Sequence, residues 1–460
     1  MTLGAYLTSL RGKKLAVLGI GVSNTPLIRL LCGAGLDVTA RDRRETLDAG
    51  QREELEALGA KLVLGEGYLD GLTGCDVIFR TPGLRPDLPQ IAAAVDAGAE
   101  LTSEMEAFFQ VCPATLVAVT GSDGKTTTTT ITAGLLEASG KKVWVGGNIG
   151  NPLLDRAEEM QPGDFAVLEL SSFQLMTMRQ SPHIAAVTNL APNHLDVHRS
   201  MEEYVDAKRN ILRFQGPGDR AVLNWDNALT RGFAKDTPAA VRWFSFREEP
   251  EGDAVFYRDG VVWLKDNTGT RQLLRREDIL LPGDHNVENY MAAIAAVQAY
   301  VSPEVIQNYA RTFGGVEHRI ELVRELDGVR WYNDSIGTSP SRTIAGLRSF
   351  PEKVILIAGG YDKHIPYDPL GPELVAHVKR MFLTGDTAPK LRAAAENAPG
   401  YSPELVIEDC ASLEDAVREA RAAARPGDVV LLSPASASFD RYKNFMERGR
   451  AFKELVRGLT

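Results

Sequence analysis

The stretch VAVTGSDGKTTTTT, residues 117–130, has the composition of a phosphate-binding loop with one position out of pattern. The Walker A pattern places a glycine five residues before its Gly-Lys pair, but that position is Val119 and the first glycine is Gly121. Glycines let backbone N–H groups turn inward, and the following helix adds its positive N-terminus. Lys125 adds a full charge, and Thr126 has the hydroxyl that ligates magnesium in P-loop enzymes. A glycine-rich turn with a solvated lysine is disfavoured, because the loop lies between an apolar strand and a helix.

Further along the chain, acidic and basic side chains follow in a pattern that suits metal ions. Glu169 ends the apolar strand of VLELSSFQL, where a magnesium ligand would meet the loop, although such a glutamate alone is more often solvated. His194, Asp196, His198 and Lys208 then follow within a short span. Each alone is more often a surface residue, and their spacing matches no zinc motif. Together they could hold a second metal.

The N-terminal segment GIGVSN, residues 19–24, approaches the dinucleotide-binding fingerprint, but Asn24 replaces its third glycine. Asp42 ends the next strand about 20 residues later, where an acid that binds ribose would lie. A nucleotide is therefore plausible here and NAD is poorly supported. A glycine turn without a ligand is an equal alternative.

Strand and helix patterns alternate along the chain and restart twice, near Pro113 and near Phe313. This order predicts an α/β protein of three units with mostly parallel sheets, the first of them doubly wound. An Asp-Gly turn also predicts a hairpin over residues 253–269.

Composition excludes several classes of protein. The chain has 460 residues and a formal net charge of -10, which argues against a nucleic-acid or anionic-membrane surface. Cys32, Cys75, Cys112 and Cys410 are far apart and form no CxxC pair, so neither a zinc site nor a disulfide framework is expected. No signal peptide is visible, and no apolar run reaches the roughly 18 residues that span a bilayer. We expect a soluble, monomeric, cytoplasmic protein without stable membrane insertion.

Nine blocks of sequence between about Leu15 and Phe452 resemble the Mur ligase family in their order and spacing: TGSDGKTT, GGNIGNPL, LELSSFQL, NHLDVH, YVDAK, GDHNVENYMAA, EHRIE, NDSIGTSPSRT and SPASASFDRYKNF. In that family the shortened G-x-x-G-K-[ST] loop is the normal ATP site, which explains Val119. The resemblance implies three domains: an N-terminal Rossmann-like domain that binds the UDP-linked substrate, a central P-loop-type ATPase and a C-terminal Rossmann-like domain. We place them at residues 1–110, 111–312 and 313–460. The resemblance further implies an ATP-dependent ligase that joins D-glutamate to UDP-N-acetylmuramoyl-L-alanine through an acyl phosphate and releases ADP and phosphate. This is a step of cytoplasmic peptidoglycan precursor synthesis.

The resemblance also implies roles for individual residues. ATP would contact Gly121, Ser122, Asp123, Gly124, Lys125, Thr126 and Thr127 of the loop, Asn286 and Asn289 near adenine, and His318, Arg319 and Asp334 around the ribose and phosphates. Thr126 and Glu169 would serve a first magnesium ion. His194 would serve a second, or would accept a proton from the attacking amine; we favour the ligand role. Lys208 stands where relatives carry a carbamate formed with carbon dioxide.

The substrates would be bound by two further groups of residues. The matches for the UDP-linked substrate are Asp42, Arg43, Arg44, Thr81, Gly83, Asn148 and Ser171, and those for D-glutamate are Thr338, Lys363, Ser438 and Phe445. A lysine and two hydroxyls suit a dianion, because fixed donors hold its carboxylates without protonating them. Ile336 departs from the lysine that many relatives have there, and Arg43 from a threonine found in some.

Other readings remain open at this stage. A sister ligase could add L-alanine, a diamino acid or a dipeptide, and a folylpolyglutamate synthetase would use the same ATP core. The blocks NDSIGTSP and SPASASFDRYKNF favour D-glutamate. A nicotinamide-dependent oxidoreductase would rest on GIGVSN alone. A non-catalytic nucleotide-binding scaffold is disfavoured by the intact Lys125, Glu169 and Lys208.

Overall fold

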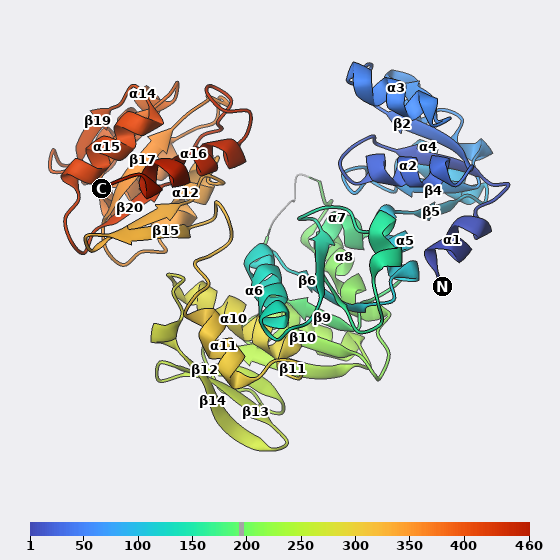
Figure 1. Ribbon diagram of the computed structural model, residues 1–460, viewed down its shortest axis with the longest axis horizontal. Helices are drawn as coiled ribbons and strands as arrows, with labels where there is room; N and C mark the ends of the chain where they lie inside the picture. Colours follow the sequence, from blue (N-terminus) through green and yellow to red (C-terminus); the bar gives the residue numbers. More distant parts are fainter. Residues whose placement is uncertain (193–196) are drawn as a thin grey trace. The chain divides into compact units, whose positions relative to one another are not determined.

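The structure is a computed structural model that describes residues 1–192 and 197–460. It contains three β-sheets (Figure 1). The chain divides into two compact units: Met1–Arg276 with Val287–Tyr309, which holds the first two sheets, and Glu277–Asn286 with Ala310–Thr460, which holds the third. The domain limits at residues 110 and 312 stay predictions. In the described part of the chain, no helix has the length and apolar character needed to cross a membrane.

The N-terminal sheet is fully parallel and has the order β3-β2-β1-β4-β5. Its strands are β1 (Lys14–Leu18), β2 (Asp37–Asp42), β3 (Lys61–Leu64), β4 (Val77–Arg80) and β5 (Glu100–Thr102), and its helices are α1 (Leu3–Ser9), α2 (Asn24–Gly33), α3 (Ala49–Ala57) and α4 (Pro89–Asp96). Because β1 lies between β2 and β4, the chain changes direction across the sheet there. The loops that follow these three strands therefore meet at one edge.

The central sheet has nine strands in the order β14-β13-β12-β11-β10-β9-β6-β8-β7. Its strands are β6 (Thr115–Thr120), β7 (Val143–Gly147), β8 (Phe165–Glu169), β9 (Ile184–Val187), β10 (Arg220–Asn224), β11 (Ala240–Ser245), β12 (Ala254–Arg258), β13 (Val261–Asp266) and β14 (Gly269–Arg275). The strands from β7 to β12 are parallel to their neighbours, while β12, β13 and β14 pair antiparallel. The expected hairpin is confirmed: Asp259 and Gly260 turn with φ 52° and 76° between β12 and β13.

Helices of the central region precede, separate and follow these strands along the chain. They are α5 (Glu104–Val111), α6 (Lys125–Ala138), α7 (Ser172–Leu175), α8 (Met201–Arg213), α9 (Ala228–Gly232), α10 (Asp284–Val297) and α11 (Pro303–Ala310). Since β9, β6, β8 and β7 are adjacent and parallel, the residues after them gather at one edge.

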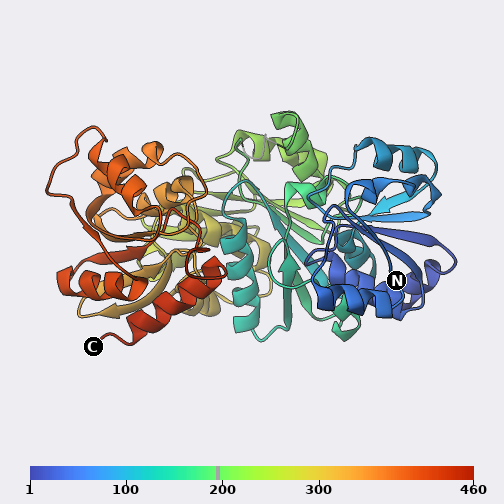
Figure 2. The same cartoon turned by 90° about the horizontal axis from the view of Figure 1, so that it is seen from above.

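The C-terminal sheet has the order β15-β16-β20-β17-β18-β19, and only its edge pair β15-β16 is antiparallel. Its strands are β15 (Glu321–Leu326), β16 (Val329–Asn333), β17 (Val354–Gly359), β18 (Val378–Thr384), β19 (Val406–Asp409) and β20 (Val429–Leu432). Helices cover both of its faces (Figure 2), and each face has its own apolar core. One core includes residues of α12 (Pro340–Leu347), α13 (Gly371–His377) and α14 (Ala388–Glu396), and the other of α15 (Leu413–Ala423) and α16 (Phe445–Arg457). The predicted α/β class with mostly parallel sheets is confirmed.

Candidate ATP and substrate sites

The glycine-rich loop joins β6 to the N-terminus of α6, as the sequence predicts. Gly124 has φ 77° and Gly121 has φ 150°, which favour glycine. A Cβ atom on Gly121 would lie 1.9 Å from Thr188 Oγ1, and one on Gly124 would lie 2.3 Å from Asn289 Oδ1. A side chain at either position would therefore displace Thr188 or Asn289, and the positive φ values favour glycine at both.

Side chains around the loop fix its backbone. Lys125 Nζ donates to the carbonyl oxygens of Gly121 (3.0 Å) and Ser122 (2.8 Å), so its charge lies over the loop. The backbone N–H of Asp123 donates to Asn189 Oδ1 (2.9 Å), and Ser122 Oγ is 2.8 Å from the hydroxyl of Tyr204. A helix N-terminus with a fixed lysine in this arrangement favours a polyphosphate.

The carboxylate of Glu169 meets two of the other predicted residues at the end of β8. Its Oε2 accepts a hydrogen bond from Thr126 Oγ1 at 2.7 Å, and its Oε1 accepts one from Asn148 Nδ2 at 2.8 Å. Glu169 is only 2% exposed. Hydroxyl and carboxylate oxygens are the ligands that Mg²⁺ prefers, so Thr126 and Glu169 fit this ion.

The described residues offer fewer ligands for a second metal ion than for the first. Within residues 1–192 and 197–460, no cluster of three or more histidine, cysteine, aspartate or glutamate side chains could hold a metal. His194, the predicted ligand, lies outside the described residues, as does Asp196. His198 is buried, and its Nε2 is 2.9 Å from Ser172 Oγ. This contact and the stacking of its ring on Phe173 give it a packing role.

Lys208 lies on α8 beneath the phosphate loop and is only 2% exposed. Its Nζ donates to the carbonyl oxygen of Gly121 (2.8 Å) and to Thr120 Oγ1 (3.2 Å), and lies 4.9 Å from the ring of Tyr204. Burial, together with the charge of Lys125, holds the pKa of Lys208 well below its usual range. The lowered pKa favours the neutral amine, which is the nucleophilic form of a lysine.

The predicted nucleotide residues of the N-terminal sheet gather where β1, β2 and β4 end. Asp42 Oδ2 accepts from the backbone N–H of Ile20 (2.7 Å), and Arg44 forms an ion pair with the same carboxylate at 3.0 Å. Gly19, with φ 87°, packs against Thr81, whose Cγ2 would lie 2.8 Å from an added Cβ. Arg43 and Gly83 are exposed at this edge. Ser171 follows Glu169 and caps α7 through the N–H of Gln174.

In the second unit, the four residues predicted to bind D-glutamate come after adjacent strands, three of them on loops and Phe445 as the first residue of α16. Thr338 follows β16, Lys363 follows β17, and Ser438 and Phe445 follow β20. Lys363 Nζ donates to the carbonyl oxygen of Thr338 at 3.3 Å, and Ser335 Oγ donates to that of Phe445 at 2.8 Å. The structure therefore brings these loops together at the carboxyl edge of the sheet, where α/β folds bind ligands.

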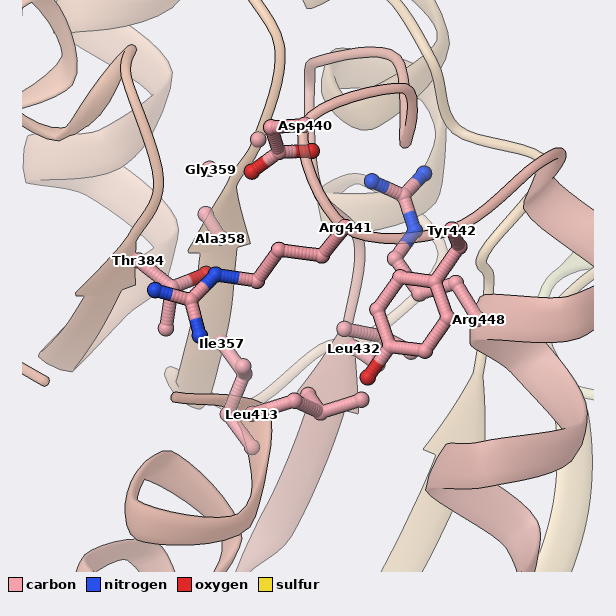
Figure 3. Close-up of a pocket in the computed structure, with 11 residues that line it drawn as sticks. Ile357, Ala358, Gly359, Thr384, Leu413, Leu432, Asp440, Arg441, Tyr442 and Arg448 are labelled. Atoms are coloured by element: carbon pink, nitrogen blue, oxygen red, sulfur yellow. The ribbon is translucent and has the colours of Figure 1, made fainter. Parts of the chain in front are cut away.

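A small cavity opens at the same edge, between the ends of β17, β18 and β20 (Figure 3). Gly359, Thr384, Arg441 and Arg448 line it, and Figure 3 shows Arg441 reaching toward Thr384. Arg448 is buried and donates to the carbonyl oxygens of Ser335, Ser436 and Ala437 at 3.0–3.1 Å. It thereby ties the loop after β16 to the loop after β20.

The residues expected around the ATP ribose are fixed by a strained turn. His318 has φ 66° and Ile320 has φ 43°, values that are uncommon for such side chains. Glu321 Oε2 accepts the backbone N–H of His318 at 2.9 Å, and Lys453 donates to Glu321 Oε1 at 2.7 Å. Burial lowers the pKa of His318. The turn presents Arg319 beside it.

Asp334 and the two asparagines of α10 complete the predicted set. Burial raises the pKa of Asp334 to about 7, and its Oδ2 accepts from Ser433 Oγ at 2.7 Å. Asn289 Oδ1 accepts from Thr128 Oγ1 at 3.2 Å, which places this side chain at the phosphate loop. Asn286 donates to the carbonyl oxygen of Pro282 at 2.7 Å.

Comparison with known proteins now identifies the family. Three family models match the chain: the Mur ligase MurD-like N-terminal domain over residues 13–103, the Mur ligase middle domain over 119–297, and the Mur ligase glutamate ligase domain over 318–436. The UDP-N-acetylmuramoylalanine–D-glutamate ligase of Acetivibrio thermocellus is 54% identical over 462 residues, which cover 99% of each chain. The chain belongs to the Mur ligase family.

Further relatives agree with this assignment. A protein of the same name from Clostridium beijerinckii is 50% identical over 97% of each chain. Among solved structures, the UDP-N-acetylmuramate-alanine ligase of Thermotoga maritima has a TM-score of 0.57 at 19% identity, covering 97% of this chain and 99% of that one. A likeness at this identity shows the shared fold. Membership of the Mur ligase family makes the chain an ATP-dependent ligase of peptidoglycan precursors.

Sequence reasoning missed several residues that hold the Mur ligase site together. Tyr204 contacts Ser122 through its hydroxyl and Lys208 through its ring. It precedes Lys208 by four residues in the block YVDAK, so helical spacing puts both on one face, and this signal was available. Arg448 acts across a long sequence separation from Ser335, for which local patterns give no signal.

Proposed function

We propose that this chain is the Mur ligase that joins D-glutamate to UDP-N-acetylmuramoyl-L-alanine and converts ATP to ADP and phosphate as it does so. The observation that carries the chemistry is the meeting of Lys125, Thr126, Glu169 and Lys208 at the ends of β6 and β8 and on α8. The choice of substrates is supported by the names of full-length relatives about half identical to the chain. We place the enzyme in the cytoplasm as a monomer.

In the proposed reaction, the alanyl carboxylate attacks the γ-phosphorus of ATP and ADP leaves. The product is an acyl phosphate, whose leaving group a free carboxylate lacks. The amine of D-glutamate then attacks the acyl carbon, loses a proton and expels phosphate. The barrier to the first step is electrostatic, because a carboxylate must approach a triphosphate in line. Lys125 and the N–H groups of the loop lower it by stabilising charge on the phosphoryl oxygens.

Two magnesium ions would supply further charge neutralisation when bound. Thr126 and Glu169 would hold the first ion. Asn148 donates a hydrogen bond to the other oxygen of Glu169 and is an exposed residue, so it could also contact the acceptor. For the second, we propose His194 together with a carbamate on Lys208. The neutral amine of Lys208 adds to the carbon of CO₂ and releases a proton, which turns a cation into a carboxylate-like oxygen ligand. The buried, depressed-pKa amine supports this modification.

D-Glutamate would be held by Lys363, Thr338 and Ser438, with Phe445 beside them. The loops that carry them are linked by hydrogen bonds, so the donors are fixed before the amino acid arrives. A cation with neutral hydroxyl donors suits two carboxylates. On the nucleotide side, Asp42, Arg43, Arg44, Thr81, Gly83 and Ser171 would bind the UDP-linked acceptor.

The test is the dependence of ADP release on each substrate. Purified protein receives ATP, Mg²⁺ and UDP-N-acetylmuramoyl-L-alanine with D-glutamate, L-alanine, a diamino acid or no amino acid. Of the amino acids tested, only D-glutamate should sustain the release of ADP. The Lys125→Ala variant should release no ADP with any of them. Release with another amino acid would identify a sister ligase, and amide formation without ADP would refute the mechanism.

A further inference from the structure

The loop that follows β4 is fastened at both ends to the central sheet's helices by two arginines that no sequence pattern singles out. Arg80 is the last residue of β4, and Arg85 lies five residues later. Between them lie Thr81 and Gly83, which the proposed function assigns to the UDP-linked acceptor. The side chain of Arg80 contacts α7 and the residue Thr177 after it, whereas the side chain of Arg85 contacts α8.

Arg80 is 1% exposed, and its guanidinium binds only oxygen acceptors of the main chain and a hydroxyl. Its Nη1 donates to the carbonyl oxygens of Thr81, Pro82 and Leu84 at 2.5–3.3 Å. Its Nη2 donates to the carbonyl oxygen of Phe173 (2.8 Å) and to Thr177 Oγ1 (3.2 Å). One rigid fork thus holds the nucleotide loop and the α7 segment together. A lysine, with a single nitrogen, cannot bridge both sets.

Arg85 holds the far end of the loop against α8. Its Nη1 donates to the carbonyl oxygen of Val197 (2.7 Å), and its Nη2 to Glu203 Oε1 (2.7 Å). The same guanidinium contacts both oxygens of Asp87 at 2.8 Å, and Arg199 forms an ion pair with Asp87. Arg85 lowers the pKa of Glu203 to about 2, so this carboxylate stays charged at neutral pH.

These two anchors connect the nucleotide loop to the reacting groups. The α7 segment begins directly after Glu169 at the end of β8, and α8 carries Lys208. We infer that Arg80 and Arg85 are positioning residues that set the placement of the UDP-binding loop relative to the phosphoryl-transfer groups. They thereby make the enzyme select acceptors that carry the nucleotide. This inference rests on the proposed function and deepens it.

In the contacts described above, neither arginine touches the phosphate loop or the residues predicted to bind D-glutamate. Loss of either arginine should therefore weaken the binding of the UDP-linked acceptor and leave the binding of ATP and D-glutamate unchanged. For Arg80→Lys and Arg85→Met, we expect the KM for UDP-N-acetylmuramoyl-L-alanine to rise about tenfold or more, with the KM for ATP and for D-glutamate within about twofold. For an acceptor without the nucleotide, N-acetylmuramoyl-L-alanine, kcat/KM should change little, so the preference for the UDP-linked form falls.

Controls separate positioning from general damage. Arg242 is also a buried arginine on a strand, β11, and it forms an ion pair with Asp253. This ion pair involves neither α7 nor α8. Arg242→Lys should therefore leave all three KM values unchanged. Adding Glu203→Gln to Arg85→Met should raise the KM for the acceptor little further, since the ion pair between Arg85 and Glu203 is already lost. Arg85 is partly exposed, so its variant keeps the test usable if Arg80→Lys does not fold.

The outcomes are distinct for the two claims. If the wild-type chain releases no ADP with the UDP-linked acceptor and D-glutamate, the proposed function is wrong and this inference is wrong with it. If the wild type ligates but Arg85→Met and Arg80→Lys keep their KM for that acceptor, only this inference is overturned. Equal rises in all three KM values would also overturn it.

Discussion

At the scale of single residues, burial decides which charged groups can do chemistry. Lys208 and Glu169 are each 2% exposed, and the two differ in what surrounds them. Glu169 accepts hydrogen bonds from the hydroxyl of Thr126 and the side-chain amide of Asn148. Lys208 faces a carbonyl oxygen and a hydroxyl but also the charge of Lys125, so its neutral form is favoured. A buried lysine of this kind is expected to be modified or to serve as a nucleophile.

Replacing Lys208 tests this view directly. Lys208→Ala should lower the rate of ADP release about a hundredfold or more, because a charged ligand is lost from the phosphoryl-transfer groups. Short carboxylates such as formate, added to the variant, should restore part of the rate by standing in for the carbamate that we propose. Lys235→Ala, which changes an exposed lysine of the same sheet region, is the control. Full activity in Lys208→Ala would exclude a role for this side chain.

Glu104 provides a test of burial away from the chemistry. Burial raises its pKa to about 7, and its Oε1 accepts the backbone N–H of Leu154 at 3.3 Å. Between the ordinary glutamate pKa and about pH 7, the unfolded chain loses this proton while the folded chain keeps it. Folding stability therefore falls as pH rises through that window and is no longer changed by this group above it.

Glu104→Gln should remove this contribution, because the amide does not titrate and its oxygen still accepts the N–H of Leu154. In urea unfolding, the variant should gain stability relative to wild type between pH 5 and pH 8. Glu158→Gln, at an exposed position, should show no such change. If the free energies of unfolding of Glu104→Gln and wild type differ by a constant amount across this pH range, the raised pKa of Glu104 is contradicted.

At the scale of elements, the parallel strands place the functional groups. The end of β6 carries the phosphate loop, and neighbouring β8 carries Glu169. The helix α6 depends on its two flanking glycines, Gly124 and Gly140, whose φ values are 77° and 76°. Their surroundings differ: a Cβ on Gly124 would meet Asn289, whereas one on Gly140 would meet nothing within 4 Å.

This pair gives a matched experiment. Gly124→Ala and Gly140→Ala should each lose about 1 kcal/mol of stability from the left-handed backbone. Only Gly124→Ala should also displace Asn289 and distort the phosphate loop, so only this variant should weaken ATP binding, by about tenfold or more. Calorimetric titration with ATP measures the affinity, and thermal unfolding measures the stability. Equal ATP affinities in the two variants would show that Asn289 can move without cost.

A feature of the fold or the site could be predicted from the sequence when a few neighbouring residues determine it. The loop at Gly121–Thr126, the strand end at Glu169 and the hairpin at Asp259 were readable, because each follows from spacing along a few residues. The anchoring by Arg80 was not, since its partners Phe173 and Thr177 lie more than ninety residues away. In the sequence, VIFRTPG simply reads as a strand followed by a turn, and nothing in it indicates an arginine that is 1% exposed.

At the scale of the whole molecule, the proposed substrate contacts are divided between the two units. The phosphate loop, Lys208 and the residues predicted to bind the UDP-linked acceptor belong to the first unit, and the four residues predicted to bind D-glutamate belong to the second. The predicted ATP contacts are shared, because His318, Arg319 and Asp334 belong to the second unit. Each unit has its own sheet edges and its own cores. Substitutions at the D-glutamate residues should therefore affect the affinity for D-glutamate, while the UDP-linked acceptor keeps its affinity.

Lys363 tests this division, because its Nζ is exposed and meets only the carbonyl oxygen of Thr338 among the contacts described for it. Lys363→Ala should raise the KM for D-glutamate about tenfold or more, since a cation facing a substrate carboxylate is lost. The KM for ATP and for the UDP-linked acceptor should stay within about twofold. Lys353→Ala, an exposed lysine of the same unit whose Nζ donates to Val375, should change none of the three. A rise in the acceptor KM that matches the rise for D-glutamate would show that the units do not bind their substrates separately.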